Sequence, residues 1–133
     1  MEKEVVVSVN GSESRIVFID HEHGAMGLEN VMMTYSPHAF LVVLAVDDLS
    51  SLDTADSLLQ GLKNSAVLHE KAVILVANKT DLVRNREVKS AMGKELAVKY
   101  NVKYIETSPG EIQSRNSAPA AIQHQSMEGL NWY

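Results

Sequence analysis

The stretch ILVANKTDLVRNREV, residues 74–88, starts as an apolar run and then changes to the four residues Asn-Lys-Thr-Asp at 78–81. The apolar part predicts a buried strand over residues 72–77. A loop that only reversed the chain would more often use Gly, Pro or Ser. An amide, an ammonium and a carboxylate within four residues therefore indicate that this loop holds a flat, polar ligand.

Strands and helices alternate on both sides of this stretch. The continuous apolar run at 40–46 predicts another strand covered on both faces, and residues 103–107 predict a third. Apolar residues at helical spacing predict helices over 52–64 and 86–100. Such alternation predicts parallel βαβ units, and hence an α/β fold.

The N-terminal segment has a different pattern. Residues 5–9 and 15–19 are rich in β-branched residues, and Asn10-Gly11 between them predicts an antiparallel hairpin, which brings the expected strands to about five. Residues 28–35 predict a short helix that Ser36-Pro37 ends. Residues 111–133 show no sustained periodicity, and we expect this tail to be disordered.

Composition excludes several function classes. The 133 residues suffice for one domain, and the net charge of −5 disfavours nucleic acid as a partner. The sequence has no cysteine, which excludes disulfides and thiolate metal sites and fits a cytoplasmic protein. No apolar run approaches the roughly 20 residues of a membrane span, so we expect no transmembrane segment.

Ligands of parallel α/β sheets bind beyond the carboxyl ends of the strands. The Asn-Lys-Thr-Asp loop lies at one such end and suits guanine, because the Asp81 carboxylate can accept from both N1–H and the exocyclic amine. Asn78 can bridge to the base, and the Lys79 stem can cover the ring. Ser108, at the end of the next strand, can support the Asp81 carboxylate.

These residues resemble a known family. The segments 78–84, 86–88 and 104–108 are similar to the guanine-recognition half of Ras-like small GTPases, of the P-loop NTPase type. The likeness is to the RGK branch, the Rad, Gem and Rem relatives, in an insect-like form. It covers roughly residues 4–110, so we expect a partial Ras-like domain over 1–110. The resemblance places Thr107, Ser108 and Pro109 beside Asn78, Lys79 and Asp81 in the guanine site.

The resemblance also implies an activity and partners. The family binds GTP and GDP with Mg²⁺, and RGK proteins hydrolyse GTP slowly if at all. They restrain voltage-gated calcium channels through the auxiliary subunit, take part in cytoskeletal signalling, and act in the cytoplasm or at the inner face of the plasma membrane. Tail residues 111–133 contain a single basic residue, Arg115, and lack the basic membrane-attaching tail of many relatives.

Three departures leave an alternative open. The pattern G-x-x-x-x-G-K-[ST], whose backbone cradles phosphates, occurs nowhere in the sequence. The switch region reads Asp20 to Gly24, with the glycine one place late and no glutamine to orient a water, so we assign no catalytic residue. Pro109 stands where the family offers a backbone N–H to guanine, and it has none. The alternative is a nucleotide-free protein-interaction module. A metal site at His21 and His23 is a third hypothesis, and we favour a solvated loop there.

Overall fold

The computed structural model describes residues 2–21, 27–80 and 82–108, and the expectation for the tail 111–133 lies outside them. The chain divides into two compact units, Met1–Pro37 and His38–Tyr133. The two units are described separately below.

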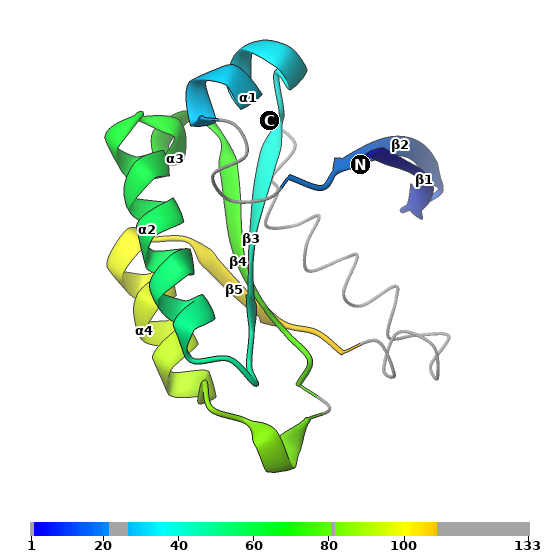
Figure 1. Cartoon of the computed structure of the whole chain (residues 1–133). Coiled ribbons are helices and arrows are strands. Elements are labelled where there is room, and N and C mark those ends of the chain that lie inside the picture. Colours follow the sequence, from blue (N-terminus) through cyan, green and yellow to red (C-terminus); the bar gives the residue numbers. More distant parts are fainter. Residues whose placement is uncertain (1, 22–26, 81, 109–133) are drawn as a thin grey trace. The chain divides into compact units, whose positions relative to one another are not determined.

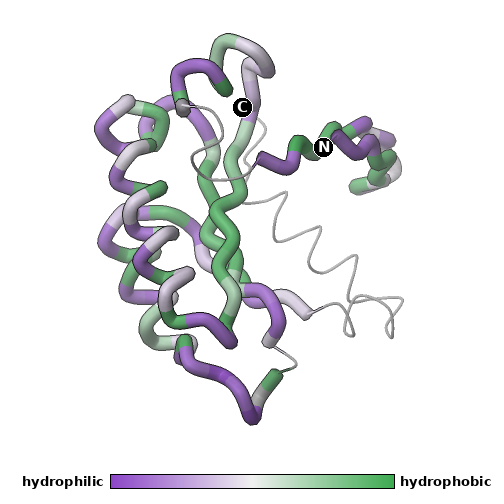
Figure 2. The backbone as a smooth tube through the Cα atoms, viewed as in Figure 1, coloured by the Kyte–Doolittle hydropathy of each residue, from purple (hydrophilic) through white to green (hydrophobic). Residues whose placement is uncertain are grey.

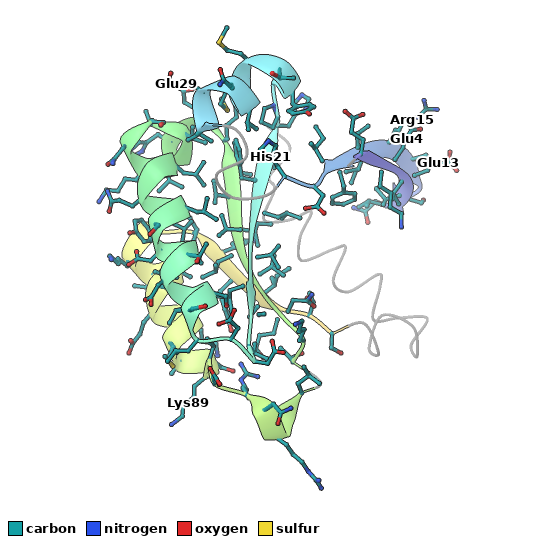
Figure 3. The ribbon with its side chains drawn as sticks, viewed as in Figure 1. Glu4, Glu13, Arg15, His21, Glu29 and Lys89 are labelled. Atoms are coloured by element: carbon teal, nitrogen blue, oxygen red, sulfur yellow. The ribbon has the colours of Figure 1, made fainter. Side chains whose placement is uncertain are left out.

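The first unit contains the expected hairpin. Strands β1 (Glu2–Val9) and β2 (Ser12–Ile19) pair antiparallel, with Val9 opposite Ser12. Asn10 and Gly11 have φ values of 51° and 79°, the left-handed conformation that these two residue types tolerate best. Glu4 on β1 and Arg15 on β2 form an ion pair, with Nε 3.1 Å from Oε1 (Figure 3). The prediction of a hairpin is confirmed, with strands longer than expected.

The same unit ends in the expected short helix, α1 (Leu28–Tyr35). Its C-cap, Ser36, adopts a left-handed φ of 45° and donates its N–H to Met32 O at 3.0 Å. Pro37 follows directly and cannot continue the helical hydrogen bonds. The predicted helix boundaries are confirmed.

The second unit is a parallel sheet in the order β3-β4-β5, comprising β3 (Ala39–Ala45), β4 (Ala72–Asn78) and β5 (Lys103–Glu106). Helices α2 (Ser50–Asn64) and α4 (Ser90–Tyr100) connect the strands and lie side by side beside the sheet (Figure 1). A short helix, α3 (Val67–Glu70), precedes β4 and was not expected from the sequence. The predicted α/β class and βαβ units are confirmed, and the five strands form two sheets.

The core of the second unit centres on β4. Every residue from Val73 to Ala77 is buried, and apolar residues run through both β3 and β4 (Figure 2). β3 differs, because Leu41 and Val43 are 43% and 55% exposed. The expectation that β3 is covered on both faces was therefore wrong. Among the described strands, β3 lies at one edge of its sheet, whereas β4 has a neighbouring strand on each side.

The helix expected over 86–100 starts later, at Ser90. Before it lie a 3₁₀ turn, η1 (Val83–Asn85), and an extended segment. The amides of Glu87 and Val88 donate to Val46 O at 2.7 and 2.9 Å, so they are committed to the end of β3 and not to a helix. Glu87 was expected at the start of the helix; instead its Oε2 accepts from Leu49 N at 3.0 Å.

Candidate functional site

Asn78 is the last residue of β4 and is held at both its backbone and its side chain. Its carbonyl accepts from Val46 N at 3.1 Å, next to the end of β3. Its side-chain Oδ1 accepts from Thr107 Oγ1 at 3.1 Å, just after β5. An asparagine amide has one oxygen and an NH₂ group with two donors. Thr107 occupies one of the two lone pairs of this oxygen and orients the amide, and the NH₂ group supplies donors for a ligand.

Lys79 turns the chain away from the strand. It has a left-handed φ of 66°, and its carbonyl accepts from Leu82 N at 3.0 Å. Its side chain is 47% exposed and ends in an ion pair, with Nζ 3.3 Å from Asp47 Oδ2. The loop therefore begins with a sharp turn that directs Lys79 towards the residues following β3.

Asp47 is a site residue that the sequence analysis missed. It follows Val46 at the carboxyl end of β3, the strand that pairs with β4. Its Oδ2 holds Lys79, whereas its Oδ1 is buried without a hydrogen-bond partner in the described part of the chain. The signal was present in the sequence, since the carboxyl ends of neighbouring parallel strands meet at one edge of a sheet.

The end of β5 is tied to the same loop. Thr107 N donates to Ala77 O at 2.8 Å, and its carbonyl accepts from Thr80 N at 3.2 Å and Thr80 Oγ1 at 3.1 Å. Ser108 follows and is 1% exposed. The structure thus brings Asn78, Lys79, Thr107 and Ser108 together at the carboxyl ends of β4 and β5.

The remaining candidate residues are not joined to this group by the structure. Asp81, Pro109 and Gly24 lie outside the described residues, so their contacts stay predictions. Asp20 is exposed after the end of β2 and belongs to the first unit, whereas the guanine candidates belong to the second.

A cluster around Glu106 fixes β5 and the loop before α4. Glu106 Oε1 accepts from Ser90 Oγ at 2.6 Å, from Tyr104 Oη at 2.8 Å and from the Arg86 guanidinium. Arg86 also donates from Nε to Val88 O at 2.8 Å. The sequence analysis places Arg86 at the start of the helix expected over 86–100, but the structure places it before α4, where the Glu106 carboxylate holds its side chain.

The Glu106 cluster also sets the charges of its members. Burial raises the pKa of Glu106, but hydrogen bonds from Arg86, Ser90 and Tyr104 outweigh it, and the pKa lies below its ordinary value. The hydrogen bond to Glu106 raises the pKa of Arg86. Burial, and then the hydrogen bond to Glu106, raise the pKa of Tyr104. Arg86 and Glu106 are thus a charged pair that holds the end of β5 beside Thr107.

Comparison with known proteins identifies the family. The Ras family pattern matches residues 26–125, which include all of β3 to β5 and the Asn-Lys-Thr-Asp loop. The chain belongs to the Ras family. Its relatives include three members of the RGK branch, which confirms the resemblance inferred from the sequence.

The Ras-family chain resembles these relatives over part of its length. It is 34% identical to GTP-binding protein RAD of Mus musculus over 77% of the chain, and 37% identical to GTP-binding protein GEM of Homo sapiens over 68%. It is 43% identical to GTP-binding protein REM 2 of Homo sapiens over 53% of the chain. These matches cover 33%, 27% and 21% of the three relatives, so the chain spans a third or less of each.

The described residues of this Ras-family chain offer no metal centre. Within residues 2–21, 27–80 and 82–108, no three His, Cys, Asp or Glu side chains are grouped so that they could hold an ion. The part of the site that these residues form consists of an amide, a lysine and two hydroxyl side chains at the carboxyl ends of β4 and β5.

Proposed function

We propose that this chain binds the guanine base of GTP and GDP at the carboxyl ends of β4 and β5. The observation that carries the proposal is the hydrogen bond from Thr107 Oγ1 to Asn78 Oδ1. It fixes the Asn78 amide so that its NH₂ group is left for the acceptors on a purine edge. The names of the relatives, each a GTP-binding protein, support the same ligand.

The proposed recognition divides the base among several side chains. Asp81 accepts from guanine N1–H and the exocyclic amine, a pairing that adenine cannot offer. Asn78 donates to the base, the Lys79 stem covers one ring face, and Ser108 supports the Asp81 carboxylate. Pro109 gives no N–H to the base oxygen, and one lost hydrogen bond of this kind costs about 1–3 kcal/mol.

The resemblance to RGK proteins supports weak or absent hydrolysis. The sequence contains no G-x-x-x-x-G-K-[ST] pattern, and Asp20 and Gly24 are the only positions that the resemblance assigns to phosphates or switch. We propose Mg²⁺ only together with the nucleotide phosphates, as the family resemblance implies, and assign no catalytic step to the ion.

The proposed biological role follows from the family. We propose that residues 1–110 act as a partial RGK-type signalling domain that regulates voltage-gated calcium channels through the auxiliary subunit, or cytoskeletal signalling. Such a role places the chain in the cytoplasm or at the inner face of the plasma membrane. Within the described residues, no helix has the length and apolar character needed to cross a membrane.

A second candidate is a nucleotide-free interaction module. One specific observation favours it: Pro109 stands where the family offers a backbone N–H to guanine, and proline has none. A domain that kept the fold and lost the ligand could carry such a residue without cost.

Titration with fluorescently labelled GDP in the presence of Mg²⁺ separates the two. Guanine binding predicts micromolar or tighter affinity that Asp81→Asn abolishes, because the amide replaces one acceptor oxygen with a donor. The matched control is Asp53→Asn, an exposed aspartate on α2 whose change should leave the affinity intact. No detectable binding by a folded sample would reject the first proposal in favour of the second.

A further inference from the structure

A groove of about 290 Å³ lies between α2 and α4, and none of the guanine candidates lines it. Its floor is apolar and comprises Leu52, Met92 and Leu96. Asp53 lines it from α2 and Glu95 from α4. The two helices that carry these residues lie side by side (Figure 1). The groove is therefore an apolar surface with a carboxylate on each of its two helices.

At one end of the groove, hydrogen bonds between side chains connect α2 to α4. Asp56 accepts from Tyr100 Oη and from Lys99 Nζ, which lies 3.1 Å from Oδ1. Lys99 also lies over the Tyr100 ring, 5.1 Å from its centroid. The hydrogen bonds from Tyr100 and then Lys99 lower the pKa of Asp56, so this carboxylate is ionised and its charge is already paired. This end holds the two helices together.

The other two carboxylates of the groove, Asp53 and Glu95, differ from Asp56. Asp53 and Glu95 are exposed, and in the part of the chain that the structure describes neither forms an ion pair or a side-chain hydrogen bond. Because the charges of Asp56 and Lys99 cancel, the net charge of the groove is the negative charge of Asp53 and Glu95. A cationic partner would pair with both of them at once.

The size of the groove limits its occupant. At about 290 Å³ the groove lies at the lower limit of small-molecule pockets, which measure about 300–1,000 Å³, so it suits single side chains better than a whole cofactor. Met92 and Lys99 mark its extent along α4, and seven residues of helix span about 10 Å. That length accommodates about two turns of a helix from another protein.

We propose that this groove binds an amphipathic helix of a partner protein, with one or two apolar side chains on the floor and Lys or Arg on either side. The apolar residues of such a helix, at i and i+4, would contact Met92 and Leu96, and its cations would pair with Asp53 and Glu95. A second copy of this chain is disfavoured, because a chain of net charge −5 repels itself. The site is separate from the guanine site, so nucleotide is not required.

The probe is a labelled synthetic helix of about 15 residues, with Leu at i, i+3 and i+4 and Lys elsewhere. Fluorescence anisotropy with the full chain measures its affinity. We expect the double variant Asp53→Asn, Glu95→Gln to weaken binding about fivefold, as expected for two surface ion pairs. Adding Met92→Ala to this double variant should weaken binding of the probe further, because it removes part of the apolar floor.

The matched control is Glu29→Gln, Glu70→Gln. It removes the same charge, and Glu29 lies in the first turn of α1 as Asp53 lies in the first turn of α2. The groove is supported if only the Asp53 and Glu95 variant loses affinity and if amide shifts in an NMR titration map to α2 and α4. Equal losses in both double variants, unchanged affinity in the groove variant, or no binding of the probe would each reject it.

Discussion

Lys79 and Asp47 form an ion pair across the carboxyl ends of two neighbouring parallel strands, with Nζ 3.3 Å from Oδ2. Lys79 follows β4 directly, and Asp47 follows β3 two residues after its end. The two side chains are 47% and 26% exposed, so the pair is partly screened by solvent. The pair therefore determines where the lysine of the proposed guanine site lies.

We expect Asp47→Asn to weaken GDP binding two- to fivefold. The neutral amide no longer holds the Lys79 ammonium, and such partly exposed pairs contribute about 0.2–1 kcal/mol. Titration with labelled GDP measures the change, and repeating it at about 1 M salt should remove most of the difference, because salt screens the pair. Equal affinities of the two proteins at low salt would show that Asp47 does not position the lysine.

Thr107→Val should lower both stability and guanine affinity. The change keeps the side-chain shape but removes the hydroxyl that donates to Asn78 Oδ1, so the amide is free to rotate. Urea unfolding should show a loss of about 1 kcal/mol. Thr54→Val is the control: Thr54 Oγ1 donates at 3.3 Å to Ser50 O at an exposed position of α2, and its loss should cost less and leave GDP binding unchanged. A loss of affinity in the control as large as that in Thr107→Val would contradict the role of the Asn78 contact.

Much of this fold could be predicted because its local signals agree. The Asn10-Gly11 turn, the Ser36-Pro37 helix end and the apolar run of β4 each act over a few residues, and each was predicted within a residue or two. The start of α4 was not, because Glu87 and Val88 donate to Val46 O, some 40 residues earlier in the chain. A pattern read along the sequence contains no information on such a distant partner.

Part of the candidate site could likewise be predicted from the sequence. Asn78, Lys79, Thr107 and Ser108 meet because the carboxyl ends of parallel strands share an edge, a rule that needs only the order of the strands. Asp47 obeys the same rule and was missed, since a carboxylate after a strand is also typical of a turn. The Arg86–Glu106 pair depends on side-chain packing. Its two residues are 20 positions apart, and nothing in the sequence indicates that they meet.

Glu106→Gln should lower the free energy of unfolding by about 2 kcal/mol near neutral pH. Three donors, on Arg86, Ser90 and Tyr104, then face a neutral acceptor in place of a carboxylate. Urea midpoints of the two proteins measure the difference. An unchanged midpoint would mean that solvent replaces the carboxylate without cost.

The same pair of proteins tests the titration of Glu106. Its pKa in the folded chain lies below the ordinary value of 4.5, so its stabilisation is fully present above pH 4.5 and is lost as the pH falls through the folded pKa. The stability difference between wild type and Glu106→Gln should therefore be largest above pH 4.5 and shrink below it. A difference that stays constant from pH 7 to pH 3 would contradict a charged Glu106 in this cluster.

Gly93→Ala should destabilise the chain although alanine favours helices. A Cβ at Gly93 would lie 2.8 Å from both Cζ and Oη of Tyr104, so the ring must move and its hydrogen bond to Glu106 must stretch or break. Overpacking of this kind costs about 1–3 kcal/mol, which exceeds the gain of up to about 1 kcal/mol in helix propensity. Gly61→Ala in α2 is the matched change, because nothing lies within 4 Å of its Cβ, and it should stabilise by the propensity gain alone. Thermal or urea unfolding of the two variants should thus shift in opposite directions, and a shift of both towards higher stability would show that Tyr104 is free to move away from α4.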